Sequence, residues 1–277
     1  MKRFIFLFSG IFMLALTGTS FAQMPAGIPD LPTGERPQSW HIWNASALGW
    51  NQPVLGDMIK VYRKMPWGEG KTLLTCDSHA RAGGLGTISP YYMRPAVMLG
   101  ISPLLIMDLD VHYGPGFNVL NHKFKSFRDH YEPMKLGTPD DYMYAFHQFQ
   151  ANLLLKAAYW RFAVLSMNDF NYYKSKDYMF EWEAATIVKD GPDFRTKEFL
   201  LYEFIPNWRV YANYENYNYY PAHFMTELAS TGIVYMRPSF HNLTVISQVG
   251  YHVHNTKYHG IKVWIAAIME WDFPDKN

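Results

Sequence analysis

Apolar and polar residues alternate most clearly near the end of the sequence, where IKVWIAAIMEWDFPDKN covers residues 261 to 277. The apolar residues recur at every second position: Val263, Ile265, Ala267, Met269, Trp271 and Phe273. The positions between them include the charged residues Lys262, Glu270 and Asp272. A period of two places the two sets on opposite faces of a β-strand. The stretch 261–273 is therefore predicted to be a strand with one apolar face.

The same alternation recurs in four other stretches: LLIMDLDVHYG at 104–114, FQANLLLKA at 149–157, NWRVYANYEN at 207–216 and LTVISQVGYHVH at 243–254. Repeated alternation over about ten residues is typical of transmembrane β-barrels, although each segment taken singly is a weak signal. A soluble β-sandwich also alternates, because its strands bury one face and show the other to water. Both fold classes are all-β, and the pattern favours the barrel.

In a barrel, the polar face of each strand points into the lumen, where charged side chains can pair with one another. The residues predicted to line the lumen are Asp108, Asp110, His112, Arg209, Glu215, Lys262, Glu270 and Asp272. The apolar face then contacts lipid. Aromatic residues such as Trp160, Trp208 and Trp271 lie near the ends of the alternating segments, which suits the headgroup level of a membrane.

Composition narrows the classes of partner. Charged residues make up 18% of the 277 residues and aromatic residues 17%. The formal net charge of +1 argues against a nucleic-acid partner, because phosphate binding needs a basic surface. Cys76 is the single cysteine, so the chain forms no internal disulfide.

The first 22 residues have the features of a secretory signal peptide. Lys2 and Arg3 precede an apolar run from Phe4 to Leu16, and Ser20 and Ala22 supply the small residues that signal peptidase requires. The apolar run is shorter than the ~20 residues of a membrane-spanning helix. We therefore expect cleavage after Ala22 and export of the mature chain.

These features together resemble the outer-membrane β-barrel proteins of Gram-negative bacteria. The resemblance rests on the signal peptide, the amphipathic strands between about residues 70 and 273, and the aromatic-rich final strand. It implies a location in the outer membrane, contact with the lipid bilayer and insertion by the barrel assembly machinery. Members of this class commonly end on an aromatic residue that this machinery recognises. Phe273 fits that role, although Pro274, Asp275, Lys276 and Asn277 follow it.

Four parts of the chain are predicted: a signal peptide at 1–22, an irregular proline- and tryptophan-rich extension or plug at 23–70, a β-barrel at 71–273 and a short tail at 274–277. The eleven candidate strands are 71–81, 91–101, 103–113, 143–155, 159–171, 178–188, 197–205, 207–217, 224–236, 239–253 and 259–273. Bacterial barrels usually have an even number of strands, so ten or twelve are expected. Either EAATIVKDGPDFRTKEF at 183–199 belongs to one outer hairpin, in which case 178–188 and 197–205 are not separate spans, or a strand precedes Lys71.

An alternative exists for residues 138–157. Thr138, Pro139, Asp140 and Asp141 are a good helix start, because they offer a capping hydroxyl, a proline in the first turn and early acidic residues. The apolar residues that follow also fit several helical turns. A helix here would lie in an external loop or favour a soluble fold.

Few sequence motifs indicate a catalytic, cofactor-binding or metal-binding site. The sequence contains no nucleophile elbow, zinc-protease helix, phosphate-binding loop or dinucleotide fingerprint, and no cofactor is predicted. His252 and His254, with His259 across a short loop, are weak candidates for metal ligands. A membrane lipase would need a serine such as Ser230, Ser239 or Ser247 beside His241 or His252.

Three functions follow from the sequence. The favoured one is a weakly selective channel for small solutes. The others are a structural or surface-interaction barrel with a filled lumen and an outer-membrane enzyme that modifies lipid.

Overall fold

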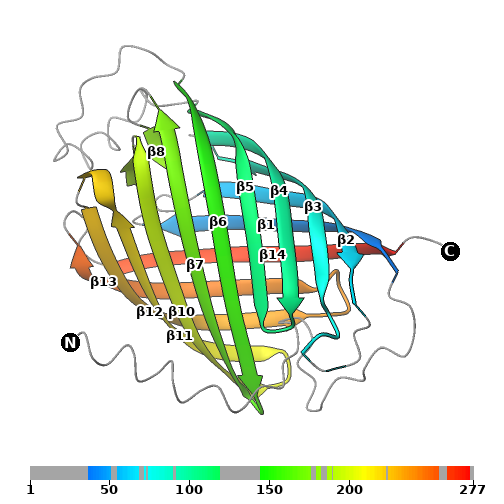
Figure 1. Cartoon of the computed structure of the whole chain (residues 1–277). Coiled ribbons are helices and arrows are strands. Elements are labelled where there is room, and N and C mark those ends of the chain that lie inside the picture. The colour runs from blue at the N-terminus through cyan, green and yellow to red at the C-terminus, as the bar shows by residue number, and fades with distance from the viewer. Residues whose placement is uncertain are drawn as a thin grey trace.

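The computed structural model describes residues 37–50, 55–68, 72, 74–89, 92–118, 144–175, 179–181, 186–188, 190–222, 224–255 and 261–274. Its twelve long strands form a closed antiparallel β-barrel (Figure 1). They are β1 (Ser39–Trp50), β2 (Leu55–Pro66), β3 (His79–Ile88), β4 (Tyr92–Leu104), β5 (Met107–Asn118), β6 (Tyr144–Tyr159), β7 (Phe162–Ser175), β10 (Gly191–Ile205), β11 (Trp208–Tyr219), β12 (Phe224–Arg237), β13 (Leu243–Asn255) and β14 (Ile261–Pro274).

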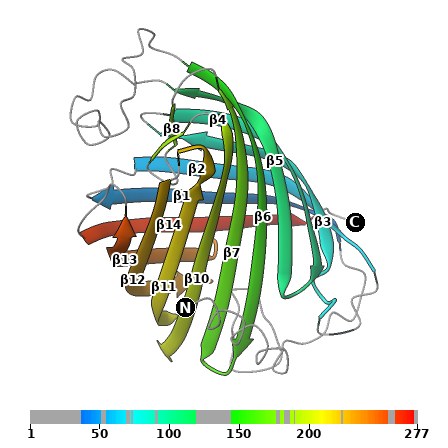
Figure 2. The ribbon, with the colours of Figure 1, turned by 60° about the vertical axis from the view of Figure 1, so that its left-hand side comes forward.

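Each strand pairs with its neighbours along the chain, and β14 pairs with β1 to close the barrel. The closing register runs from Ser39 opposite Pro274 to Trp50 opposite Val263. The final strand therefore closes the barrel against the first one. Figures 1 and 2 show β5, β6 and β7 on one wall crossing the direction of β1 and β14 on another, as expected when tilted strands wrap around a barrel.

The described residues contain twelve barrel strands, one of the two predicted values, but two of the predicted strands are misplaced. Within 178–188, β8 (Met179–Glu181) and β9 (Thr186–Val188) pair with each other in a separate two-stranded sheet and not with a barrel strand. The predicted strand 71–81 starts too early, because β3 begins at His79 and residues 74–77 are a turn.

Two strands, β1 and β2, lie where an irregular extension was predicted. Ser39–Trp50 and Leu55–Pro66 are fully paired barrel strands, so the barrel begins before residue 71. The six prolines of 23–70 suggested broken pairing, yet Pro66 stands at a strand end and no proline lies between Ser39 and Trp50. The predicted signal peptide lies outside the described residues.

The helical alternative for 138–157 is wrong where the structure describes it. Tyr144–Tyr159 form β6, whose residues pair with β5 and β7 along their whole length. Pairing on both sides satisfies the backbone of this segment within the sheet, and this overrides its local helix-start signals. Thr138 to Asp141 lie outside the described residues.

The side chains of each strand alternate between the lumen and the outer surface. Along β11, Arg209, Tyr211 and Asn213 are buried, whereas Trp208, Val210 and Ala212 are exposed. In β14, Val263 is 40% and Ile265 48% exposed on the outer face, as the sequence pattern predicted. Apolar residues outside and polar residues inside are the arrangement of a transmembrane β-barrel.

The two ends of the barrel differ in their connections. One end, which we call the turn end, carries the tight connections at 105–106, 160–161 and 206–207, together with the start of β1 and the end of β14. The opposite end, the loop end, carries the connections between β5 and β6 and between β7 and β10. Short turns on the periplasmic side and longer loops outside are usual in such barrels.

Exposed aromatic side chains collect around the turn end. They are Trp40, Tyr159, Trp160, Phe162, Phe204, Trp208, Phe240 and Phe273. Several contact one another, for example Trp160 with Phe162 and Trp208 with Tyr235. A ring of aromatic residues at this level matches the girdle that anchors barrels at a membrane interface.

Within the described residues, no helix has the length and apolar character needed to cross a membrane.

Arginine substitutions on β14 test which face of this strand contacts lipid. Val263→Arg or Ile265→Arg should destabilise the folded barrel by about 2–4 kcal/mol if the residue lies near the bilayer midplane. The control Lys262→Arg keeps its charge on the inner face and should cost little. Unfolding and refolding by urea in lipid vesicles measures the difference, and equal costs on both faces would contradict a lipid-facing stripe.

Candidate functional site

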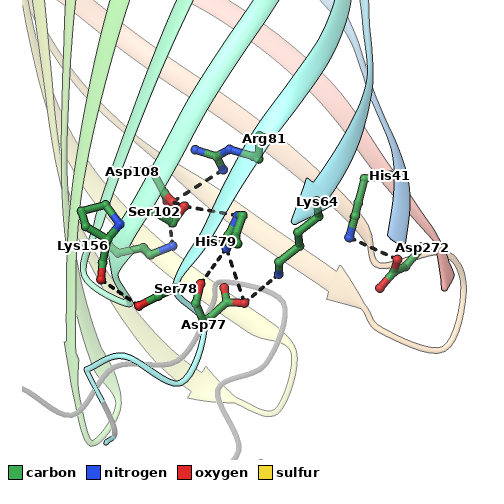
Figure 3. A network of polar contacts seen from close by, with 11 residues as sticks. His41, Lys64, Asp77, Ser78, His79, Arg81, Ser102, Asp108, Lys156 and Asp272 are labelled. Atoms are coloured by element: carbon green, nitrogen blue, oxygen red, sulfur yellow. Dashed lines mark hydrogen bonds and ion pairs between the residues drawn. The ribbon is translucent and has the colours of Figure 1, made fainter. Parts of the chain in front are cut away.

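The inner wall carries a charged cluster on β3, β5 and β6, which we call the wall cluster: Arg81, Asp108, Asp110 and Lys156 (Figure 3 shows all but Asp110). The Lys156 Nζ lies 2.8 Å from Asp108 Oδ2, and the Arg81 Nη2 lies 2.9 Å from Asp110 Oδ1. Arg81 Nη1 is also 3.5 Å from Asp108 Oδ1. The four side chains are between 12% and 17% exposed, so water reaches them from the lumen.

The Arg81–Asp110 pair crosses over a glycine. Arg81 stands opposite Gly100 on β4, and Gly100 stands opposite Asp110 on β5, so the two charges come from strands that are not neighbours. A Cβ atom at position 100 would lie 2.0 Å from Asp110 Oδ1 and 3.0 Å from Arg81 Nε. Gly100 therefore provides the space in which the ion pair lies flat against the wall.

The wall cluster continues toward the turn end of the barrel (Figure 3). Ser102 donates to Asp108, and its Oγ is 3.3 Å from His79 Nε2. The His79 Nδ1 is 2.6 Å from the backbone carbonyl of Asp77, whose carboxylate pairs with Lys64 at 2.6 Å. This chain of contacts fixes the connection between β2 and β3 to the inner wall.

A second polar group lies near the loop end, on β7, β10 and β11. Asp193 has no solvent exposure and accepts hydrogen bonds from Asn171 at 2.7 Å, Arg195 at 3.1 Å and Tyr217 at 3.3 Å. Arg195 also donates to the Tyr173 hydroxyl at 2.8 Å. We call these five residues the loop-end layer. All five side chains are buried, so they pack closely against one another on this side of the barrel.

Apolar side chains occupy part of the lumen between these regions and the turn end. Ala163, Leu201, Tyr211, Val234 and Met236 form one buried cluster on four adjacent strands. The cluster narrows the interior on the wall opposite β1 and β2 in the strand order.

The structure brings only some of the predicted lumen residues together. Asp108 and Asp110 share the wall cluster, and His112 follows them on the inner face of β5, where its Nδ1 is 3.5 Å from Gln150 Oε1. Arg209 lies on the other wall, and Glu203 accepts from its Nε and Nη2 at 3.0 and 2.8 Å.

The remaining predicted residues also face inward. Glu215 interacts electrostatically with Lys262 and accepts a hydrogen bond from Gln248 at 3.0 Å. Glu270 lies within electrostatic reach of Lys64 and Lys156. Asp272 stands at the turn end, 3.1 Å from His41 Nε2. Glu215 and Lys262 thus interact within the predicted set, while most of the hydrogen bonds and ion pairs described here join predicted residues to residues outside it.

The predicted metal site stays a prediction, because the side chain of His254 and the whole of His259 lie outside the described part of the chain. The backbone register pairs His252 with Leu228 and His254 with Glu227, with a β-bulge at this step. Among the described residues, no group of three His, Cys, Asp or Glu side chains could hold a metal ion.

The serines considered for a lipase make other contacts. Ser230 donates to Asn213 Oδ1 at 2.8 Å, and Ser247 donates to the Ile233 carbonyl at 3.5 Å. His252 Nδ1 is 3.2 Å from the Thr226 hydroxyl. His241 and Ser239 belong to the connection between β12 and β13 at the turn end.

Sequence reasoning missed Arg81, Lys156, Asp193 and Arg195. Arg81 is the last residue of the candidate strand 71–81, which starts too early. Asp193 and Arg195 lie between the candidate strands 178–188 and 197–205. The spacing of Asp193 and Arg195 at i and i+2 was a usable signal, because it puts both on one strand face. Lys156 occupies a polar position of an alternating stretch, but its partner Asp108 is 48 residues away in sequence.

Comparison with known proteins gives likenesses of fold. No protein-family model matches the chain, and no curated protein matches its sequence. Among solved structures, CdiB from Acinetobacter baumannii aligns with a TM-score of 0.46 at 8% identity, covering 86% of this chain and 60% of that one. OccAB1 from the same species aligns at 0.43 and 10%, covering 79% and 58%. An outer membrane channel from Pseudomonas putida F1 aligns at 0.43 and 8%, covering 90% and 100%.

The protein resembles outer-membrane β-barrels. At these TM-scores and identities the likeness carries no conclusion about activity, and the chain spans only about three fifths of the first two proteins. The barrel itself rests on the register of its own strands.

Gly100→Ala tests the ion pair that crosses β4. The new methyl group must displace the Asp110 carboxylate from Arg81, so we expect a loss of about 1–3 kcal/mol in the free energy of unfolding. In an Asp110→Ala background the same substitution should cost little, because the clash is gone. Gly84→Ala is the control, since its Cβ would meet only the Ala96 carbonyl at 3.7 Å. Equal effects at both glycines would contradict the packing argument.

Proposed function

We propose that the protein is a narrow, weakly selective channel for small solutes in the bacterial outer membrane. The observation that supports this most is the wall cluster, whose paired charges line the lumen and remain in reach of water. Charges that face an aqueous path inside a wall of low dielectric constant act on passing solutes. Export by the predicted signal peptide and insertion by the barrel assembly machinery are parts of the same proposal.

Selectivity is weak because the charges in the lumen balance. The wall cluster contains two acidic residues, Asp108 and Asp110, and two basic ones, Arg81 and Lys156. Glu203 and Arg209 form another neutral pair on the opposite wall. A lumen lined by paired charges favours neither cations nor anions strongly.

Neutralising one sign in the wall cluster should change ion preference. Asp108→Asn with Asp110→Asn leaves Arg81 and Lys156 unpaired, so the zero-current potential in a salt gradient should shift toward anion preference. Lys156→Gln is the matched control of opposite sign and should shift the potential toward cations. Planar-bilayer recordings measure both, after a heat-modifiability gel shows that each variant folds.

The channel proposal fails if the folded wild type gives no conductance. Conductance that is the same in all variants would place the ion path away from the wall cluster.

One observation favours a second candidate, a structural barrel with a filled lumen. The loop-end layer is buried, and large inward side chains beside it, including Tyr219, Phe146 and Gln148, have almost no exposed surface. Barrels of this size can be filled by their own side chains. In the channel proposal the same layer is the narrowest part of the path.

Tyr173→Ala distinguishes the two candidates, because Tyr173 is fully buried in the loop-end layer. If the layer is a constriction, removing this ring should raise single-channel conductance. The cost in stability should be about 3–5 kcal/mol, as for other buried aromatic residues. The control is Tyr172→Ala at the next position, where the side chain is 44% exposed on the outer face. A folded Tyr173→Ala variant without conductance would favour the filled barrel.

A further inference from the structure

Three hydrogen-bond acceptors lie together on the inner wall, and two of them have no hydrogen-bond partner among the described residues. These two are the buried atoms Asn152 Oδ1 and His112 Nε2, whereas the third, Asp110 Oδ1, lies 2.9 Å from Arg81 Nη2. Asp110 and His112 are two residues apart on the inner face of β5, and Asn152 stands directly opposite Asp110 on β6. Buried polar atoms normally have partners, so two unpartnered acceptors beside the Arg81–Asp110 ion pair indicate a place where a donor binds.

The hydrogen bonds around His112 decide that its Nε2 is an acceptor. Arg94 Nη2 donates to Gln150 Oε1 at 2.8 Å, and an arginine can only donate, so this atom is the amide oxygen. His112 Nδ1 lies 3.5 Å from the same oxygen, and we assign the hydrogen to this nitrogen because an N–H there faces an acceptor. In a neutral imidazole the other nitrogen is then a bare acceptor. His112 is only 2% exposed, so its orientation is fixed by packing.

We propose that Asp110, His112 and Asn152 form a binding site for a neutral, hydroxyl-rich solute such as a small polyol or sugar. The inference rests on the proposed channel function and names a class of solute for it. Directly opposed residues on paired strands have Cβ atoms about 4.5–5.5 Å apart, which suits hydroxyl groups on one small molecule. Arg81, whose Nε also has no hydrogen-bond partner, can donate to an oxygen of the same solute.

Charge argues against an ionic occupant. Three acceptors repel an anion. A cation is disfavoured because Arg81 neutralises Asp110 at 2.9 Å, and because Lys60 and Arg94 both act electrostatically on His112. A hydroxyl group donates a hydrogen bond without adding a net charge beside the neutralised Arg81–Asp110 pair. A neutral solute with hydroxyl groups therefore fits the site best.

Planar-bilayer recordings with the full chain test the site, using glycerol, erythritol and sorbitol as probes. Dimethoxyethane, which has the oxygens but no hydroxyl donors, is the comparison compound. We expect the polyols to reduce the ion current in a saturable way, beyond their effect on bulk conductivity, and dimethoxyethane to lack this effect. Equal reduction by dimethoxyethane, or saturable block by ammonium ions instead, would overturn the assignment.

Asn152→Leu removes one acceptor and should weaken polyol binding. We expect the half-saturating concentration of polyol to rise by about three- to tenfold, which corresponds to the loss of one hydrogen bond. Asn152→Ala serves the same purpose if the leucine variant does not fold. The control is Asn168→Leu, an asparagine on the outer face of β7, which donates to Ser166 and should leave polyol binding unchanged. Unchanged polyol binding in a folded Asn152 variant would contradict the proposal.

Failure of the channel can be separated from failure of the site. If the wild type gives no current, the proposed function is wrong, and calorimetric titration of sorbitol into the detergent-solubilised barrel decides the site alone. Saturable heat that Asn152→Leu weakens supports the site, and its absence overturns it.

Discussion

The pairing of every backbone group within the sheet is the constraint on which the structure depends. Hydrocarbon offers no hydrogen-bond partners, so a strand crossing a membrane must be paired on both sides, and an open sheet edge is excluded. The pairing of β1 with β14 removes both edges at once. Closure then divides each strand into an outer and an inner face, and this division produces the apolar surface and the polar lumen.

Inside the barrel, the charges are placed so that few are left without a counter-charge. The Arg81–Asp110 pair reaches over β4 because Gly100 leaves room for it, and Lys156 neutralises Asp108 from the next strand. Taking one partner from a half-buried pair is costly, since the other charge remains in a medium of low dielectric constant. The inner wall is thus held in a neutral state, which is also why we infer weak selection by charge.

The sequence determined the class of fold because alternation is a local property. A period of two is visible within a single strand, so the apolar outer face of 261–273 could be predicted without knowing which strands pair with it. The error at 71–81 and the failure to find β1 and β2 have a local cause as well. Ser39–Trp50 alternates poorly, since small residues such as Ala45, Ser46 and Ala47 follow one another, and the prolines around it suggested irregular chain. The helix-start signals before β6 were likewise a local preference that pairing on both sides outweighed.

The sequence by itself determined an all-β chain and the apolar face of β14, and it predicted only part of the polar inner wall, since Arg81, Lys156, Asp193 and Arg195 were missed. Only the tertiary structure decided which inward-facing polar residues meet, because partners across the barrel are set by strand order and register rather than by spacing. Lys156 and Asp108 are 48 residues apart, and Asn171 and Asp193 are 22 apart. The three acceptors on β5 and β6 became a candidate site only when the register placed Asn152 opposite Asp110, since a shift of one residue would have turned Asn152 to the lipid.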